Sequence, residues 1–297
     1  MTSSANISAS DRAVAAAAGR ILPYRPAESP HGRGSLHVIA RGDGRSVVSR
    51  AFATSPLRLL TPRNHGRAAW VYTSSYGGGL VDGDHITLDV DVGRGAAAFV
   101  STQASTKVYR SERGTAADLR AHVEDDGLLV VMPDPLVCFA SSRYRQAIRL
   151  DLAGGAGMVL VDWLSSGRCA SGERWAFDEY VSTLVARVDG RLVVHDALAL
   201  RAADGGLRTR LGRFDVLALA LLLGAQLRST AADIVAEVGR MPVRRRDDLL
   251  AAASPVGDGG CLLRLAGRSV EQVGRAIRQY LAVIPSLLED DPWARKW

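Results

Sequence analysis

Apolar and polar residues alternate through most of the first two thirds of this chain, and this period of two constrains the fold more than any other feature. Residues 85–92 read HITLDVDV, which places aliphatic side chains on one face of a strand and hydroxyl or carboxylate side chains on the other. Residues 144–152 show a similar pattern. Glycine or aspartate turns separate such segments at intervals of about 8–12 residues, which is typical of all-β proteins. Asp189 and Gly190 lie between two hydrophobic runs and predict a β-hairpin.

The period becomes helical in the last third of the chain. Residues 214–228 are apolar nearly all round and predict a helix that is packed on several faces. Residues 230–239 predict a second helix, which begins with a threonine cap and an aspartate in the capping-box position. Residues 261–266 predict a further strand, and Ser269 opens a final helix that extends to about residue 284.

These patterns predict a mainly β protein with C-terminal α-helices packed on its strands. The strands dominate residues 35–204, and residues 205–297 are expected to be helical with one or more further strands. No linker separates the two regions, so we expect one domain over residues 35–297. Residues 1–34 combine small polar residues with three prolines, and we expect this leader to be poorly ordered.

Composition excludes several classes of protein. With 297 residues, 47% of them hydrophobic, the chain can bury a proper core and is neither collagen-like nor mainly disordered. No apolar run approaches the roughly 20 residues of a membrane helix, and the first residues lack the apolar region of a secretory signal. The three cysteines are widely separated and offer neither a disulfide framework nor a zinc knuckle. We therefore expect a cytoplasmic protein that makes no contact with a membrane.

The net charge of +6 comes almost entirely from arginine, because Lys107 and Lys296 are the only lysines. The arginines are scattered among 31 acidic residues, and aromatic residues make up only 6% of the chain. The densest basic cluster, residues 244–246, is followed at once by Asp247 and Asp248. This distribution favours a solvated or protein-facing basic surface. An arginine-rich nucleic-acid binder is the alternative, although clustered basic and aromatic residues are typical of that class.

The common signatures of catalysis are missing from the sequence. There is no GxxxxGK[ST] phosphate loop, no HExxH helix, no GxSxG elbow and no GxGxxG turn between a strand and a helix. The six histidines are dispersed, and none is paired at helical spacing. We expect a protein that is not an enzyme. The alternative is an enzyme of unrecognised class that uses acids near Asp84 and Glu173 as acid and base.

Three segments are nonetheless richer in glycine and polar residues than a scaffold requires. Residues 77–84, GGGLVDGD, permit close approach of another chain, and their two carboxylates either cap a turn or offer oxygen ligands to a cation. Residues 101–110, STQASTKVYR, form either a polar loop before an edge strand or part of an interface or water-filled passage. In residues 163–175, Glu173 is either an exposed turn residue or a buried acid that an arginine or a cation neutralises.

These segments, together with the PDP at residues 133–135, resemble the motifs of the urease accessory protein D family. The family pattern has a GG-hydrophobic-x-GD turn, a TTQ-x-x-TK-x-YR segment, a PDP after a hairpin and a GR-x-x-x-GE-x-W segment. This chain has GGLVDGD, STQASTKVYR, PDP and GRCASGERW in the same order. It departs from the pattern at Ser101, where the family often has threonine, and at Asp82, where it often has glycine. The likeness covers about residues 45–297.

The resemblance implies a chaperone without catalytic activity that helps to load nickel into urease. Members of the family form a complex with the accessory proteins F and G, of which G is the GTPase, and dock on the urease apoprotein. The nickel-delivery protein E is a further expected partner. Nickel is implied only in transit, and no cofactor is held stably. The implied fold is a β-helix-like stack of many short strands, which agrees with the period of two.

A protein that passes nickel on must bind it weakly, which favours carboxylates, hydroxyls, carbonyls and water over thiolate cages. The acids and hydroxyls of the matched segments are therefore the expected nickel path, namely Asp84, Thr102, Asp134, Glu173 and, as an addition particular to this chain, Asp82. The alternative is that these side chains only cap turns and pair with arginines. The candidates for partner interfaces are Gln103, Lys107, Tyr109, Arg110 and Arg168.

Overall fold

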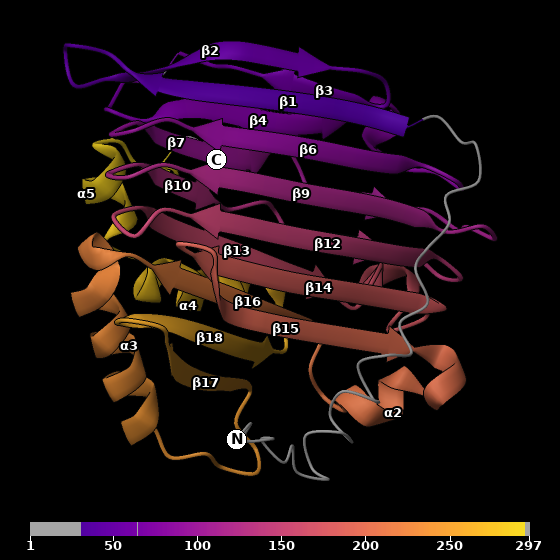
Figure 1. The fold of residues 1–297 in the computed structure, drawn as a ribbon. Coiled ribbons are helices and arrows are strands. Elements are labelled where there is room, and N and C mark those ends of the chain that lie inside the picture. The colour runs from indigo at the N-terminus through magenta and orange to yellow at the C-terminus, as the bar shows by residue number, and fades with distance from the viewer. Residues whose placement is uncertain (1–30, 64, 295–297) are drawn as a thin grey trace, which may run out of the picture.

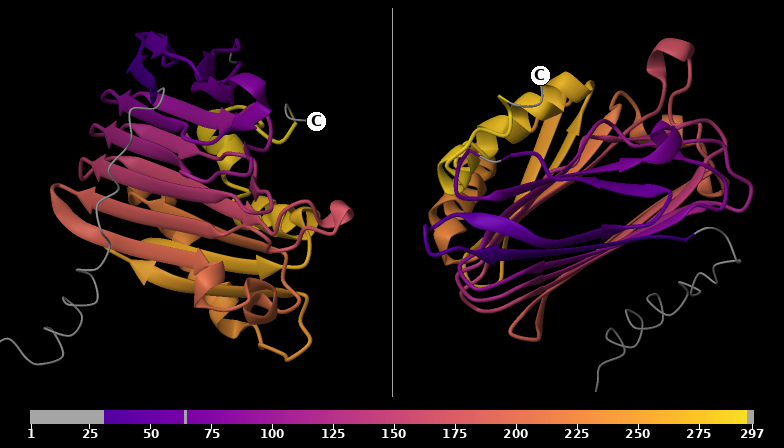
Figure 2. Two further views of the ribbon diagram at one scale, coloured as in Figure 1. Left: turned by 90° about the vertical axis from the view of Figure 1, so that its right-hand side faces the viewer. Right: turned by 90° about the horizontal axis from the view of Figure 1, so that it is seen from above.

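The computed structural model describes residues 31–63 and 65–294, which form two large sheets lying face to face (Figures 1 and 2). The seven-stranded sheet, here sheet A, has the spatial order β15 (Arg191–Arg201), β14 (Glu179–Val188), β12 (Arg143–Leu152), β9 (Thr115–Val123), β6 (His85–Val92), β1 (His31–Ala40) and β2 (Ser46–Ala53). The main path of the other sheet, sheet B, is β17 (Leu249–Val256), β18 (Gly260–Gly267), β16 (Val216–Leu223), β13 (Gly157–Ser165), β10 (Leu128–Val131), β7 (Ala97–Thr102), β4 (Ala69–Ser75) and β3 (Leu57–Leu60).

The middle of the chain winds through both sheets in successive coils. Each coil contributes a strand to sheet B, a short strand at one corner between the sheets, and a long strand to sheet A. The short strands are β5 (Gly79–Leu80), β8 (Lys107–Val108) and β11 (Leu136–Cys138). Neighbouring coils pair in parallel, so that Leu128 lies between Ala97 and Gly157, and equivalent positions recur about every 30 residues. The predicted mainly β, stacked fold is confirmed.

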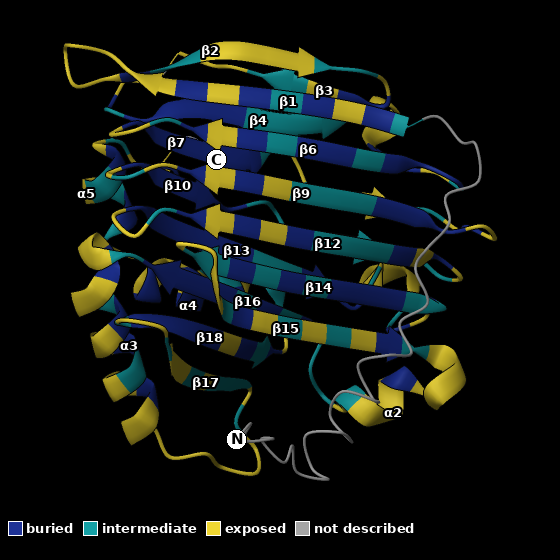
Figure 3. Cartoon of the chain, viewed as in Figure 1, coloured by how far each residue is buried: buried dark blue, intermediate teal, exposed yellow. Residues whose placement is uncertain are grey.

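Burial explains why some strands alternate in sequence and others do not. Inward side chains of both sheets form one apolar cluster, to which sheet A contributes Val90 and sheet B contributes Leu129. The outer face of sheet A is partly open to solvent (Figure 3), and the end of β6 alternates accordingly, with Val90 and Val92 buried and Asp91 exposed. Sheet B is covered on its outer face as well, because α3 (Arg228–Arg240), α4 (Val270–Tyr280) and α5 (Ile284–Leu288) pack a second cluster against it.

The helix predicted over residues 214–228 is wrong, because this segment contains β16. That strand lies between β13 and β18 in antiparallel register. A strand that is packed on both faces needs no alternation, so a continuous apolar run fits a central strand as well as a buried helix. The edge strand β17, which pairs only with β18 on the main path of sheet B, was not predicted.

The capping signals in the sequence predict the start of α4 correctly but not that of α3. The Ser269 hydroxyl accepts a hydrogen bond from the Gln272 N–H at 3.2 Å and caps α4 as predicted, although α4 ends at Tyr280 and a separate helix, α5, follows it. The capping box predicted at Thr230 is wrong, because α3 already begins at Arg228 without a side-chain cap.

The predicted hairpin at Asp189 and Gly190 joins β14 to β15, and both residues have positive φ, 48° and 75°. At the other end of the described chain, β1 begins at His31. Residues 31–34 therefore belong to a strand rather than to the expected leader. Residues 1–30, for which poor order was predicted, lie outside the described residues.

Replacing Leu129 by alanine should lower the free energy of unfolding by about 2–5 kcal/mol, because it opens a cavity between the two sheets. Leu129 is fully buried, at 0% exposure. Leu192, which is 57% exposed on β15, is the matched control, and Leu192→Ala should change stability by less than about 0.5 kcal/mol. Urea unfolding followed by circular dichroism measures both. Equal effects at the two positions would contradict this arrangement of the sheets.

Candidate functional site

The four sequence motifs meet at one corner of the molecule, where successive coils pass from sheet B to sheet A. In the parallel register, Gly79 lies opposite Lys107, Lys107 opposite Val137, and Val137 opposite Ser165. A Cβ atom on Gly79 would lie 2.4 Å from the Lys107 carbonyl oxygen, so the missing side chain lets a neighbouring coil of the same chain approach closely there. Stacking thus turns segments about 30 residues apart in sequence into neighbours.

Glu173 is held by an arginine and a backbone amide at this corner. The Arg168 Nε donates to Glu173 Oε2 at 3.0 Å, a second guanidinium N–H donates to Oε1, and the Ala140 N–H donates to Oε2 at 3.2 Å. The hydrogen bond from Arg168 lowers the pKa of Glu173 below its ordinary value. The Arg168 guanidinium also lies 4.3 Å from the centre of the Phe139 ring, which meets Tyr109 edge-on at 5.2 Å.

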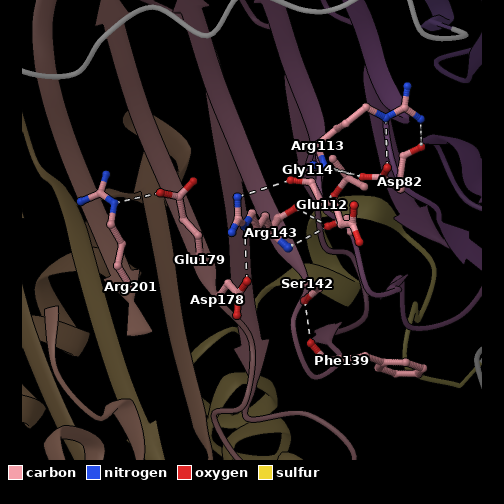
Figure 4. A network of polar contacts seen from close by, with 12 residues as sticks. Asp82, Glu112, Arg113, Gly114, Phe139, Ser142, Arg143, Asp178, Glu179 and Arg201 are labelled. Atoms are coloured by element: carbon pink, nitrogen blue, oxygen red, sulfur yellow. Dashed lines mark hydrogen bonds and ion pairs between the residues drawn. The ribbon is translucent and has the colours of Figure 1, made fainter. Parts of the chain in front are cut away.

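Asp82 and Asp84 lie in the turn between β5 and β6, and both have partners there. Asp82 accepts hydrogen bonds from the Arg113 Nε at 3.0 Å and from the backbone N–H groups of Arg113 and Gly114 at 2.8 and 3.2 Å (Figure 4). Burial opposes ionisation, but these hydrogen bonds hold the pKa of Asp82 below its usual value. Asp84 is buried and accepts a hydrogen bond from the Val81 N–H at 2.8 Å. Both side chains therefore cap turns in this conformation.

A ladder of arginine–carboxylate pairs continues from Asp82 along the same end of sheet A (Figure 4). Arg143, at the start of β12, donates to Asp178 at 3.3 Å, and Arg201, at the end of β15, donates to Glu179 at 2.9 Å. Burial opposes ionisation of Glu179 as well, but its arginine partners hold its pKa below the ordinary value. Each pair joins different coils or strands, so the ladder fixes how their ends lie relative to one another.

Thr102 and Asp134 come together at the exposed end of a cavity of about 340 Å³ between the two sheets. The Asp134 N–H donates to the Thr102 hydroxyl oxygen at 2.8 Å, and this hydroxyl lies 3.4 Å from Asp134 Oδ2. Asp82, Asp84 and Glu173 do not line this cavity. The structure therefore brings two of the five predicted nickel-path residues to one cavity wall, and places the other three in turns of the motif corner.

Asp162 lies deeper in the same cavity, and sequence reasoning missed it. Its Oδ2 accepts hydrogen bonds from the Gln146 amide at 2.6 Å, the Ser182 hydroxyl at 3.3 Å and the Tyr180 hydroxyl at 3.5 Å. Within residues 31–63 and 65–294, no arginine or lysine pairs with this carboxylate. Burial raises the pKa of Asp162 against the effect of these three hydrogen bonds. The only sequence signal for it is a single acid inside the apolar run at residues 157–164.

A second cavity, of about 500 Å³, continues from Asp162 toward the opposite end of the stack. Both cavities have Asp162 and Trp163 in their walls. The far part of the second cavity is lined by Asp196 and Arg264, which form an ion pair, and by Val243. Asp162 is thus the carboxylate that the walls of the two cavities share.

The predicted interface residues surround the motif corner. Gln103, Lys107 and Arg110 are exposed, and the latter two form no ion pair within the described part of the chain. The Tyr109 hydroxyl donates to the Gly77 carbonyl oxygen at 3.5 Å, and Arg168 is exposed although it pairs with glutamate. These positions are compatible with partner contacts, which stay a prediction.

The acid–base alternative finds no assembled site here. Asp84 and Glu173 belong to different coils, and no hydrogen bond or ion pair joins them in the described part of the chain. Among the same residues, no three His, Cys, Asp or Glu side chains are grouped so that they could hold a metal ion. The described helices are also too short or too polar for any of them to span a membrane.

The two sheets joined by parallel coils, with a few C-terminal helices, agree with the β-helix-like stack of strands that the motif resemblance implies. The family model described as UreD urease accessory protein matches residues 31–297. Urease accessory protein UreD of Sorangium cellulosum is 53% identical over 266 residues, which cover 90% of this chain and 84% of that protein. UreD of Anaeromyxobacter sp. is 46% identical, covering 86% and 87%, and urease accessory protein D of Oryza sativa subsp. indica is 34% identical, covering 84% and 92%. The chain belongs to the UreD family of urease accessory proteins.

Replacing Glu173 by glutamine should destabilise the protein by about 1 kcal/mol at pH 7, because the charge-assisted pair with Arg168 is lost. The folded-state pKa of Glu173 is lowered, so its contribution is fully present above the unfolded value of about 4.3 and is lost as the pH falls through the folded value. The difference between wild type and variant should therefore shrink toward pH 3.

Urea unfolding at pH 7 and pH 3 measures this difference, with Glu237→Gln on the exposed face of α3 as the control. A difference that is the same at both pH values would contradict the role of the ion pair.

Proposed function

We propose that this protein is a non-catalytic scaffold and nickel conduit in urease maturation. Family membership supports the role in maturation. The finer proposal is that the chain acts in a complex with the accessory proteins F and G and the urease apoprotein, and receives nickel that the delivery protein E supplies. The observation that carries the conduit is the pair of cavities that share Asp162 in their walls.

A cation that moves between two sheets must exchange its water for oxygen atoms of the protein. Thr102 and Asp134 supply such atoms at the exposed end of the first cavity, and Asp162 supplies a carboxylate where the two cavities join. The walls between them are mostly aliphatic, as at Ile148 and Leu160. Aliphatic walls leave the cation few competing ligands, so the carboxylates become the points at which it pauses.

The setting of Asp162 suits a site that binds and then releases. A buried carboxylate without a cationic partner is costly, and an entering cation would relieve that cost. Its present partners are neutral amide and hydroxyl groups, which can turn toward water or toward the cation. An arginine in their place would keep nickel out by charge repulsion. The site is therefore attractive to a cation without being a closed cage.

The cysteines support weak rather than tight binding. Burial raises the pKa of Cys138 to about 12 and that of Cys261 to about 11, so both are neutral thiols at physiological pH. Only the thiolate is a strong ligand for nickel. Neither thiol lines the two cavities, so an ion there would meet oxygen ligands, as transfer requires.

Asp82, Asp84 and Glu173 fit this proposal as residues that shape the corner. Their carboxylates are engaged by Arg113, the Val81 N–H and Arg168 respectively. A direct contact of these three acids with nickel would require their partners to release them. Their place on the nickel path stays a prediction.

Co-expression tests the function as a whole. Urease apoprotein produced with the accessory proteins F and G should gain full nickel content and activity only when this chain is also present. Nickel per active site, measured by plasma mass spectrometry, and urea hydrolysis are the two readouts. Fully charged urease without this chain at ordinary trace-metal levels would contradict the proposal.

The variant Asp162→Asn tests the conduit separately. It keeps the shape and one hydrogen-bonding oxygen but removes the charge, so urease activation should fall by about tenfold or more while the partner proteins still co-purify. Asp151, which is exposed on the outer face of sheet A, is the matched control, and Asp151→Asn should activate normally. Unchanged nickel loading with Asp162→Asn would show that nickel does not pass this residue.

A further inference from the structure

An exposed loop between α3 and β17 combines apolar and basic side chains. Its first residues, Met241–Arg246 and here called the arginine loop, read MPVRRR. Val243 is 75% exposed and Met241 is 44% exposed, which makes Val243 the most exposed large hydrophobic residue among those described. All three arginines are exposed as well. Exposed apolar residues beside arginines are typical of the contact centres of protein interfaces.

The two acids that follow the arginines do not neutralise them. The Asp247 carboxylate accepts a hydrogen bond from the backbone N–H of Arg244 at 2.7 Å, and Asp248 pairs with Arg268 at 3.2 Å. The Asp247 carboxylate is therefore hydrogen-bonded to the backbone of the loop, and the Asp248 carboxylate is paired with the arginine that follows β18. Within residues 31–63 and 65–294, the guanidinium groups of Arg244, Arg245 and Arg246 form no ion pair. The three guanidinium groups therefore have no carboxylate partner within the described residues.

The arginine loop is anchored at both ends. The Arg213 Nε donates to the Asp247 carbonyl oxygen at 2.8 Å, and the Tyr280 hydroxyl donates to the Met241 sulfur at 3.5 Å. These contacts tie the loop to the segment just before β16 and to α4, so its exposed side chains project from a fixed base. A fixed base lowers the entropy that is lost when a partner binds.

The loop also lies at the far cavity. Val243 lines the second cavity together with Asp196 and Arg264. The motif corner lies at the first cavity, on the other side of Asp162. A partner seated on the arginine loop would therefore lie beside the second cavity, away from the motif corner.

We propose that the arginine loop docks an acidic segment of a partner protein, whose carboxylates meet the three arginine forks and whose surface has an apolar recess for Val243. The inference rests on the proposed function in one respect, since it places this partner at the far end of the conduit. Charge complementarity gives the partner its class, because planar guanidinium forks pair best with carboxylates or phosphates. A protein fits better than a nucleic acid, since residues 241–248 contain no aromatic side chain for stacking on bases.

Three substitutions made together, Arg244→Gln, Arg245→Gln and Arg246→Gln, test the docking. They remove charge but keep the backbone contact between Arg244 and Asp247. The matched control replaces Arg41, Arg45 and Arg50 by glutamine. These arginines are also exposed and form no ion pair in the described part of the chain, and they lie on and beside the β1–β2 hairpin at the opposite end of the stack (Figure 1).

Affinity is measured by biolayer interferometry against purified accessory protein F, accessory protein G and urease apoprotein, each at low and high salt. The loop variant should lose about tenfold or more in affinity for one of them, and most strongly at low salt, whereas the control should stay within about twofold of wild type. A photo-crosslinking amino acid at position 243 should attach to a segment of that partner rich in Asp and Glu.

Equal binding of the loop variant and wild type to all three proteins would overturn the docking, as would a crosslink to a segment without acidic residues. Loss of binding to duplex DNA in the loop variant alone would overturn it in favour of nucleic-acid contact. Failure of the proposed function is distinguishable, because it appears as nickel-charged urease in cells that lack this chain altogether.

Discussion

Hydrogen bonding between stacked coils is the constraint on which the rest of this structure depends. Each coil supplies strands to both sheets and must match the register of its neighbours in both, for example where β9 lies parallel to β6 and β12. A shift by one residue would turn the core side chains outward and the exposed charges inward. Each coil is therefore held to a length of about 30 residues. The position of every motif follows from that repeat.

The repeat also explains why the polar groups of the protein gather in so few places. The turns at the motif corner lie directly above one another, so Asp82, Arg113 and Arg143 can form a ladder across coils. Such pairs are partly exposed and individually weak, but they fix the ends of strands that the core alone would leave free to slide. Gly79 serves the same corner, because only its missing side chain lets β5 pair with β8.

The interior between the sheets combines a packed apolar core with two cavities, whose walls share Asp162. The core that includes Val90 and Leu129 is fully buried, whereas the region around Asp162 retains two cavities and a network of neutral hydrogen-bonding groups. A fold selected only for stability would fill this space and would exclude an unpaired carboxylate. The same two sheets therefore carry both the rigid part of the molecule and the passage that we propose for nickel.

Strands β6 and β12 of sheet A, the β14–β15 hairpin and the Ser269 cap of α4 could be predicted from the amino-acid sequence alone. Each of these depends on a local signal: alternation against solvent, an Asp-Gly turn, or a hydroxyl next to the first turn of a helix. The motifs also identified the family before any contact was known. The three-dimensional contacts were needed to show that residues 216–223 are a strand and that Thr102, Asp134 and Asp162 line one cavity. The reason is that burial on both faces erases the alternating pattern, and that contacts between coils join residues about 30 positions apart, which no local signal in the sequence records.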